Sequence, residues 1–432
     1  MSTTVRAVQA GQEIAVPTAE HEAVLPPVSP TDDRDRLTAG PTRLSQGPVT
    51  APLALPPPER AVTEAPREAL PAFDWAAAMQ PPRVEVGQLV PFPPRSNDPV
   101  EQERRLQAWR EAEAEAQRQP GVGRPYHQRP EVQRLIRDIA GGDQAEQQRL
   151  MALVERVALP RATANVAPGA RPPDTRTSFE RSVRPYLESG IQRGTAYALE
   201  FGPQAEEAAR RHGIDVAAIY GTLRGETNMG GFSGGHNAFQ QIVRGAFDGE
   251  RTEFFRGELR ALVRVARERN WDLATLGGSS AGALGWCQFM PSNLVLLAGD
   301  LDPWHPVQSA ELAARFYANV GRDRPGERYT QGQPIGVELR GTPAAIRGLQ
   351  DDREMTVAQL RAAGFSIPSS FPASARGRVF RFGTEANPEA FFSGPNAITI
   401  RRYNWGERHY GDRAGLLAGR IMQAVERERA KR

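Results

Sequence analysis

A glutamate at the end of an amphipathic helix is the first candidate for chemistry in this sequence. Glu226 follows Leu223 by almost one turn, and Gly230 and Gly231 then stop the predicted helix, which spans residues 215–227. A carboxyl group on the buried edge of a helix loses solvation, which raises its pKa toward neutrality, as a general acid requires. A solvated glutamate at a helix end remains the competing interpretation of this motif taken alone.

A run of small residues forms the second candidate, in the stretch GGSSAGALGWCQFMPS at 277–292. Small residues let the backbone approach another element or a ligand closely. We expect Ser279, or Ser280, to cap a following helix with its hydroxyl, and Ser279 and Gln288 to present polar groups to a substrate from a crowded wall. Tight packing around a capped turn is the alternative. Cys287 has no histidine in a partner motif, so we interpret it as a small buried hydrophobic residue.

Aromatic and amide side chains alternate in the third candidate, TIRRYNWGERHY at 399–410. Tyrosine offers a flat face for the apolar side of a sugar ring and a hydroxyl for its rim, so Tyr403, Asn404 and Tyr410 suit a saccharide-binding wall. Aromatic packing at a strand-to-helix corner is the alternative.

The elements that must position these residues are mostly helices. Hydrophobic periodicity predicts a mainly α fold, with GPNAITIRRYN at 394–404 as a short strand and minor β element. Helices are expected at 98–118, 130–157, 178–199, 204–211, 215–227, 252–270, 291–298, 306–319, 356–363 and 412–429.

The distribution of proline divides the chain. About half of its 37 prolines fall in the first 100 residues, which favours extended or disordered backbone over a packed core. We therefore predict a disordered proline-rich tail at 1–97, a helical segment at 98–159, a linker at 160–177 and a catalytic domain at 178–432.

Composition excludes several classes of function. Net charge is +3, from 54 basic and 51 acidic residues, too balanced for a dedicated nucleic-acid coat protein. A single cysteine rules out an intramolecular disulfide and a cysteine zinc cage, and the six histidines never pair at metal-ligand spacing. Neither a membrane-spanning run nor a signal-peptide pattern is apparent, so we expect neither a transmembrane helix nor export by the usual route.

Together the three motifs resemble the membrane-bound lytic transglycosylase B family, glycoside hydrolase family 103. The resemblance covers about residues 180–428 and rests on FFRGEL at 254–259, GSSAGALGWCQFMPS, PNAITIRRYN with HY six residues later, and MTVAQLRAAGF at 355–365. It implies a lysozyme-like, α-rich catalytic domain after the tail. It also implies Glu226 as the catalytic acid and a substrate-binding set of Arg251, Ser279, Gln288, Tyr403, Asn404 and Tyr410.

This sequence departs from the family pattern at three places. Leu223 replaces the valine of the family's V-x-x-E-T motif, and Asn228-Met229-Gly230-Gly231 follows Glu226-Thr227, where the family has an aromatic or basic residue and then glycine. The family's calcium loop after QFMPS is reduced to residues 298–304, which is too short for six to eight oxygen ligands. We therefore expect no calcium and no other metal or cofactor.

The resemblance implies cleavage of the β-1,4 bond between N-acetylmuramic acid and N-acetylglucosamine in peptidoglycan, with a 1,6-anhydro product. A hydrolytic muramidase and a non-catalytic peptidoglycan-binding or structural virion protein are the alternatives. Peptidoglycan strands are the expected partner, with virion or other carrier proteins binding through residues 1–175. Delivery in a phage virion to the host periplasm or cell wall is the first expectation for localisation. Cytoplasmic residence until release by a holin or a secretion system is the second.

Overall fold

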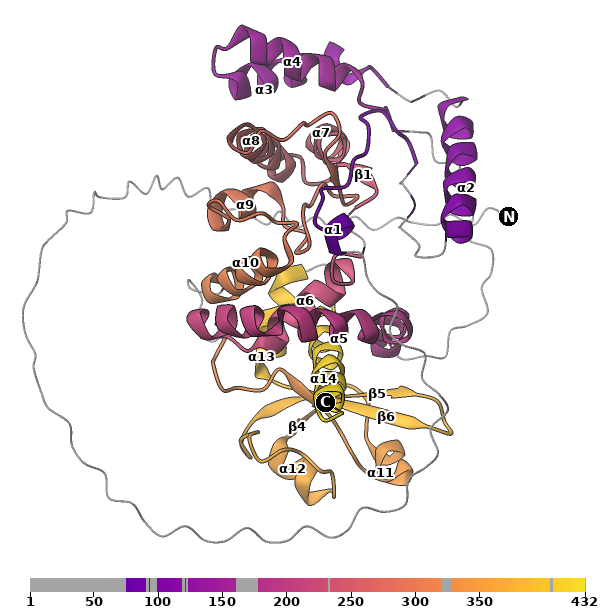
Figure 1. The fold of residues 1–432 in the computed structure, drawn as a ribbon, viewed down its shortest axis with the longest axis vertical. Helices are drawn as coiled ribbons and strands as arrows, with labels where there is room; N and C mark the ends of the chain where they lie inside the picture. Colours follow the sequence, from indigo (N-terminus) through magenta and orange to yellow (C-terminus); the bar gives the residue numbers. More distant parts are fainter. Residues whose placement is uncertain are drawn as a thin grey trace, which may run out of the picture. The chain divides into compact units, whose positions relative to one another are not determined.

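The computed structural model describes residues 75–90, 93, 99–118, 121, 123–160, 178–231, 234–320, 328–404 and 407–431. Its helices are α1 (Trp75–Ala78), α2 (Pro99–Arg118), α3 (Pro130–Ala140), α4 (Gln144–Glu155), α5 (Ser178–His212), α6 (Val216–Thr227), α7 (Ala238–Asp248), α8 (Thr252–Glu268), α9 (Pro291–Leu297), α10 (Pro306–Asn319), α11 (Pro343–Gly348), α12 (Val357–Ala362), α13 (Pro395–Arg401) and α14 (Tyr410–Arg429) (Figure 1). Short 3-10 turns lie at Tyr126–Gln128 and Arg402–Asn404. The predicted mainly α fold is confirmed.

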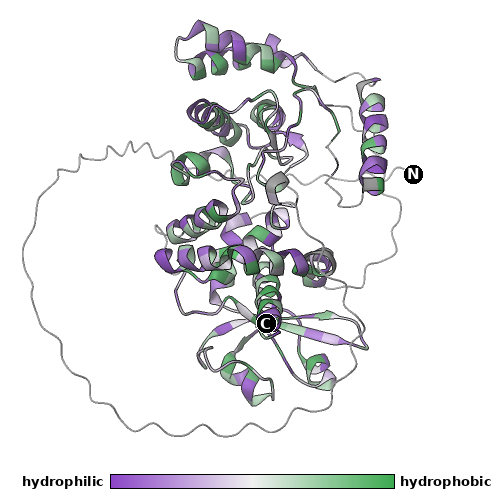
Figure 2. Cartoon of the chain, viewed as in Figure 1, coloured by the Kyte–Doolittle hydropathy of each residue, from purple (hydrophilic) through white to green (hydrophobic). Residues whose placement is uncertain are grey.

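Three helices form the centre of the domain, because α14 packs on both α5 and α6. Figure 2 shows the hydrophobic character of α14 in this position. Two glycines permit the close approach: a Cβ on Gly221 would lie 2.4 Å from the Ala414 carbonyl oxygen, and one on Gly194 would lie 2.3 Å from Ile421. The backbone of α6, which carries Glu226, is therefore held directly against α14.

A four-stranded antiparallel sheet lies beside these helices. Its order is β3 (Gly336–Glu338), β6 (Pro388–Ser393), β5 (Arg376–Gly383) and β4 (Arg353–Thr356). One face buries Val379 and Phe392 in a cluster with α11 and α12 residues, and the other buries Phe380 and Phe391 against Phe179 of α5 and Leu416 of α14. This alternation is the period-two pattern of a strand buried on both faces.

The predicted minor β element was placed wrongly. The stretch predicted as a strand at 394–404 is helix α13 followed by a 3-10 turn, with Pro395 at the first helical position and Ala397 and Ile400 buried. An alternating run of so few residues does not separate the two periods. A second pair of strands, β1 (His236–Asn237) and β2 (Gly277–Gly278), joins the two glycine-rich segments.

Two helix predictions also need correction. The single helix expected at 130–157 is divided into α3 and α4, because Gly141 and Gly142 take positive φ angles and Asp143 then caps α4 by accepting a hydrogen bond from the Glu146 amide. The two helices expected at 178–199 and 204–211 are instead one helix, α5, which continues through Pro203.

Part of the predicted disordered tail is packed on the domain. Residues 75–90 form α1 and an extended segment that bridges Leu276 through Arg83, and Val84 and Val86 are buried. The other residues of the predicted tail, 1–74, 91–92 and 94–97, lie outside the described residues. So does the predicted linker from residue 161 to residue 177. Nor is the 98–159 segment separate from the domain, because Val132, Leu150 and Val154 belong to its main hydrophobic core.

No helix in the described part of the chain is long and apolar enough to span a membrane.

The close contact between α6 and α14 gives a stability prediction. Gly221→Ala should lower the free energy of unfolding by about 1–3 kcal/mol, because the new methyl group overlaps the Ala414 carbonyl. Gly419→Ala on α14 is the matched control: its Cβ would meet nothing within 4 Å, so it should be neutral or stabilising by up to about 1 kcal/mol. Urea denaturation measures both, and equal effects would contradict this packing.

Candidate active site

Glu226 occupies the last turn of α6. Asp215 caps the start of this helix by accepting a hydrogen bond from the Ala217 amide at 2.9 Å. At its end Asn228 and Met229 take left-handed backbone angles, with φ of 53° and 54°, and the Met229 side chain is fully buried. The helix therefore ends at Thr227, and Glu226 is left partly buried in its last turn, as the sequence predicted.

Burial raises the pKa of Glu226 to about 7, and removal of the carboxyl from water is the largest cause. The nearby Glu407 carboxylate acts in the same direction. The Tyr410 hydroxyl and the Arg413 guanidinium oppose this increase, because both stabilise the ionised form. The Tyr410 hydroxyl lies close to the Glu226 carboxyl. It is buried, and none of the described residues is aligned to form a hydrogen bond with it. A carboxyl with a pKa near neutrality is able both to donate and to accept a proton.

A hydrogen bond ties the end of α6 to the second motif. The Thr227 hydroxyl donates to the Trp286 carbonyl at 2.9 Å and accepts from the Gly230 amide at 3.1 Å. Gly230 has a φ of 73° and lies so close to the Trp286 indole that a Cβ there would be 2.2 Å from the ring. The glycine is required at this position, because it lets the turn after Glu226 lie directly against Trp286.

An aromatic group surrounds the site. The Tyr403 and Tyr410 rings stack with centroids 5.8 Å apart and an interplanar angle of 6°. Phe316 packs edge-on against Tyr403 at 4.7 Å, and Phe289 lies 5.5 Å from it. The Tyr403 hydroxyl donates to the Cys287 carbonyl, so the predicted third motif joins the second at the acid.

The polar residues predicted in the second motif lie in one tight loop. The Ser279 hydroxyl oxygen accepts from the amides of Ala281 and Ala283, at 3.2 and 3.0 Å, and Ser279 directly follows β2. Gln288 has a φ of 49°, and its side-chain amide donates to the Gly285 carbonyl at 2.8 Å. Ser279 therefore caps a turn of its own loop, and the prediction that it caps a following helix is wrong, because residues 279–290 form turns.

Two of the predicted site residues are exposed side chains. Arg251 is exposed at the start of α8, and its guanidinium lies over the Phe254 ring at 4.1 Å. Asn404 is exposed in the 3-10 turn directly after Tyr403. Their assignment to substrate binding stays a prediction.

Among known protein families, the family model described as the transglycosylase SLT domain matches residues 127–418, more than half of the chain. The chain belongs to the transglycosylase SLT domain family. This membership confirms the expected class of enzyme, a peptidoglycan lytic transglycosylase, and the matched range begins well before the predicted domain boundary at 178.

Several known transglycosylases are similar to this family member. Membrane-bound lytic murein transglycosylase B of Escherichia coli is 24% identical over 320 residues, covering 70% of this chain and 85% of its own. The Escherichia coli lytic transglycosylase Slt35 in complex with bulgecin A has 22% identity and a TM-score of 0.54, covering 71% and 97% of the two chains. SltB3 of Pseudomonas aeruginosa, in complex with NAG-anhNAM-pentapeptide, has 22% identity and a TM-score of 0.51, covering 69% and 80%. The structural likeness confirms the predicted lysozyme-like fold.

The sequence analysis missed several residues around Glu226. Arg413, one turn after Tyr410 on α14, is buried and pairs with Glu407. Tyr317 of α10 is fully buried and shares a 2.6 Å hydrogen bond with Thr222 of α6. The spacing of three between Tyr410 and Arg413 placed both on one helical face and was the available signal. Tyr317 had no such signal, because the packing of α10 on α6 is long-range.

The shortened loop after α9 does not fit a calcium ion. The Gly299 and Leu301 carbonyls accept hydrogen bonds from the Arg269 guanidinium, and the Asp302 carboxyl accepts from the Trp304 amide. Two carbonyl oxygens that a metal would need are thus engaged by Arg269, and one carboxyl oxygen is engaged by a backbone amide. Within the described ranges, no three histidine, cysteine, aspartate or glutamate side chains converge as a metal site.

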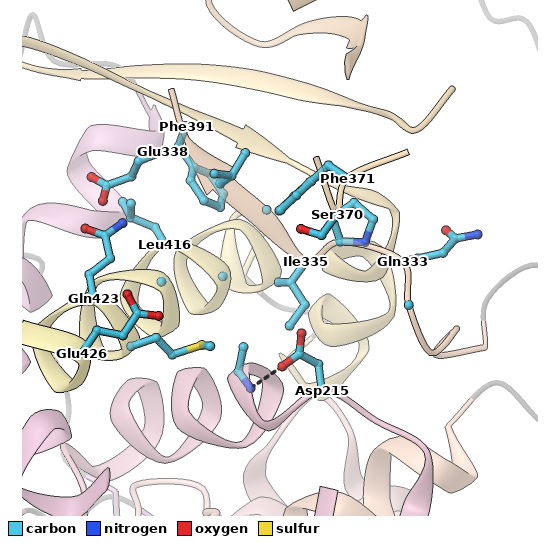
Figure 3. A pocket seen from close by; sticks show the side chains of 18 residues that line it. Asp215, Gln333, Ile335, Glu338, Ser370, Phe371, Phe391, Leu416, Gln423 and Glu426 are labelled. Atoms are coloured by element: carbon cyan, nitrogen blue, oxygen red, sulfur yellow. Dashed lines mark hydrogen bonds between the residues drawn. The ribbon is translucent and has the colours of Figure 1, made fainter. Parts of the chain in front are cut away.

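The cavity in Figure 3 is separate from this site. It has a volume of about 490 Å³ and lies where the start of α6 meets α14, β3 and β6. Its walls include Ile335, Phe391 and Leu416, and Asp215 at its edge is already occupied as the cap of α6. Glu226, at the other end of α6, does not line it. The cavity is therefore not the catalytic centre.

The raised pKa of Glu226 predicts how activity depends on pH. Since the acid must be protonated to act, kcat/KM should fall as pH rises through about 7. Tyr410→Phe removes a hydroxyl that favours the ionised form, so the midpoint of this fall should move to higher pH. Initial rates on soluble glycan strands between about pH 5 and 9 give both midpoints. A wild-type midpoint near the ordinary glutamate value of 4.5 would contradict the burial argument.

Proposed function

We propose that this transglycosylase cleaves the β-1,4 bond between N-acetylmuramic acid and N-acetylglucosamine in peptidoglycan, with Glu226 as the single acid and base. The observation that carries the proposal is one partly buried carboxyl of raised pKa beside a tyrosine pair. The half-buried Tyr403 supplies an aromatic ring of the kind that sugar rings contact, and the fully buried Tyr410 stacks behind it. A relative in Pseudomonas aeruginosa was solved with NAG-anhNAM-pentapeptide, which supports the same glycan and an anhydro product here.

The other carboxylate near the acid is already engaged. Glycosidases with two catalytic carboxylates keep the second free to attack or to activate water. Glu407 instead pairs with Arg413 and accepts a hydrogen bond from the Ser182 hydroxyl at 3.1 Å. A mechanism that uses one enzyme carboxyl and groups of the substrate therefore fits this site better.

The proposed reaction has two steps, and each balances. Glu226 first donates its proton to the glycosidic oxygen while the acetamido oxygen of the muramic residue bonds to C1, so the C1–O bond breaks and the N-acetylglucosamine side leaves as an alcohol. The Glu226 carboxylate then removes the proton from the C6 hydroxyl of the same muramic residue. The oxygen of that C6 hydroxyl bonds to C1 as the bond between C1 and the acetamido oxygen breaks. This step closes the 1,6-anhydro ring. No water is consumed, and Glu226 ends protonated.

The polar residues of the loop orient the reacting groups in this proposal. The Ser279 hydroxyl hydrogen would hold the acetamido group, and Gln288 would fix the position of the carboxyl. Asn404 and Arg251 would contact the strand farther from the cleaved bond, in keeping with their exposure.

The direct test is Glu226→Gln, assayed on purified sacculi with mass spectrometry of the released muropeptides. Removal of the acid should lower activity by at least about 10²–10⁴-fold, while the far-ultraviolet circular dichroism stays unchanged. Wild-type products should carry the anhydro ring and be one water lighter than hydrolysed products. Hydrated products would favour a muramidase. Sacculi that bind the wild-type protein but stay intact would favour a non-catalytic wall-binding protein. Full activity in Glu226→Gln would reject Glu226 as the acid.

We also propose that the proline-rich residues 1–74 bind a carrier that delivers the enzyme to the wall, with a phage virion as the first candidate. The composition of this segment supports a docking role, because such sequences bury too little apolar area to fold alone. Mass spectrometry of purified particles should detect the chain, and deletion of residues 1–70 should remove it from the particle without loss of activity in solution. Its absence from particles would favour release by a holin or a secretion system.

A further inference from the structure

One segment of the predicted tail lies directly behind the catalytic wall. Residues 75–90, here called the N-terminal clamp, run antiparallel to residues 274–277, which lead into the glycine-rich loop. The Val84 and Val86 amides donate to the Thr275 and Ala274 carbonyls at 2.9 and 3.0 Å, and the Gly277 amide donates back to the Pro82 carbonyl at 2.7 Å. The clamp therefore acts as an added strand beside the loop that carries Ser279 and Gln288.

Two buried amide side chains hold the clamp in register. The Asn237 side chain donates to the Val84 carbonyl at 2.9 Å, and also to the Leu273 and Ala274 carbonyls. The Gln240 side chain accepts from the Gly87 amide at 2.6 Å and donates to the Gln88 carbonyl at 3.0 Å. Both side chains are almost fully buried, so each hydrogen bond satisfies a group that water cannot reach.

The first residues of the clamp contact the indole that supports the acid. The Trp75 ring lies 6.0 Å from Trp286 and packs edge-on against Phe201 at 5.3 Å. The Trp286 ring nitrogen donates to the Ala78 carbonyl at 3.1 Å. On its other side, Trp286 contacts Gly230 and accepts the Thr227 hydrogen bond described above.

We propose that the N-terminal clamp is a working part of the active site and that Trp75 is a positioning residue, acting through Trp286 on the turn that holds Glu226. Trp286 is thus fixed from both sides, by the clamp and by the turn. Loss of the clamp would leave the Trp286 ring nitrogen without its acceptor and the Gly277 amide without its carbonyl. The consequence is that the enzyme is fully active only while this segment, which joins the tail to the domain, is docked.

The test compares variants of the full chain. Trp75→Ala should lower kcat by about 10- to 100-fold with little change in KM, because it displaces the acid rather than the saccharide wall. Trp75→Phe keeps a ring against Trp286 and should recover most of the activity. Phe371→Ala, which removes an aromatic residue from the separate core beside the sheet, is the control and should leave kcat unchanged.

A second variant releases the clamp without altering an aromatic ring. Gln240→Leu keeps side-chain volume but removes both hydrogen bonds to residues 87 and 88, so it should lower kcat in the same direction by a smaller factor. Wild-type kcat in both Trp75→Ala and Gln240→Leu would overturn the proposal, even if either variant melts at a lower temperature.

Hydrogen exchange separates this proposal from the proposed function, on which its kinetic test rests. In Trp75→Ala the peptides that carry the Val84, Val86 and Gly277 amides should exchange faster than in the wild type, whereas those of β5 and β6 should not. Hydrogen exchange needs no catalysis. A wild-type chain without muralytic activity would therefore reject the proposed function, while hydrogen exchange would still test whether Trp75 holds the clamp in place. Unchanged exchange in these peptides would reject the clamp alone.

Discussion

The cost of burying one carboxyl group is the constraint on which this structure depends. A glutamate side chain removed from water is destabilised in its charged form, and the fold must hold it there while keeping it reactive. The Tyr410 hydroxyl and the Arg413 guanidinium partly stabilise the charged form of Glu226. The hydrogen bond from Thr227 to Trp286 fixes the turn that carries it. Arg413 also pairs with Glu407, and burial outweighs the effect of Arg413 on Glu226, so the pKa of Glu226 is raised to about 7.

Close packing of glycine against backbone makes this arrangement possible. Gly221 lets α6 lie on α14, which brings Tyr410 to the acid, and Gly230 lets the turn lie on Trp286. These contacts join segments that are far apart in the sequence, so each is fixed by the fold and not by local preference. The sheet supports α5 and α14 through Phe179 and Leu416.

Sequence reasoning placed Glu226 at a helix end and gave the bounds of several helices, because these depend on neighbouring residues. Asp215 before an apolar-periodic run and the glycines after Thr227 were sufficient for α6. It misplaced the β element at 394–404, since Pro395 and a short alternating run suit a helix equally well. It also assigned residues 75–90 to the tail, because the partners of Val84 and Val86 lie almost two hundred residues later in the chain. Long-range pairing of that kind leaves little local signal.

The central claim is that burial gives Glu226 a pKa near neutrality, which lets one carboxyl serve as both acid and base. The most direct measurement is the titration of its carboxyl carbon by nuclear magnetic resonance in protein labelled with ¹³C-glutamate, with Glu226→Gln used to assign the signal. The account predicts a midpoint of about 7. A midpoint at the ordinary value of 4.5 would show a solvated helix-end glutamate and contradict it.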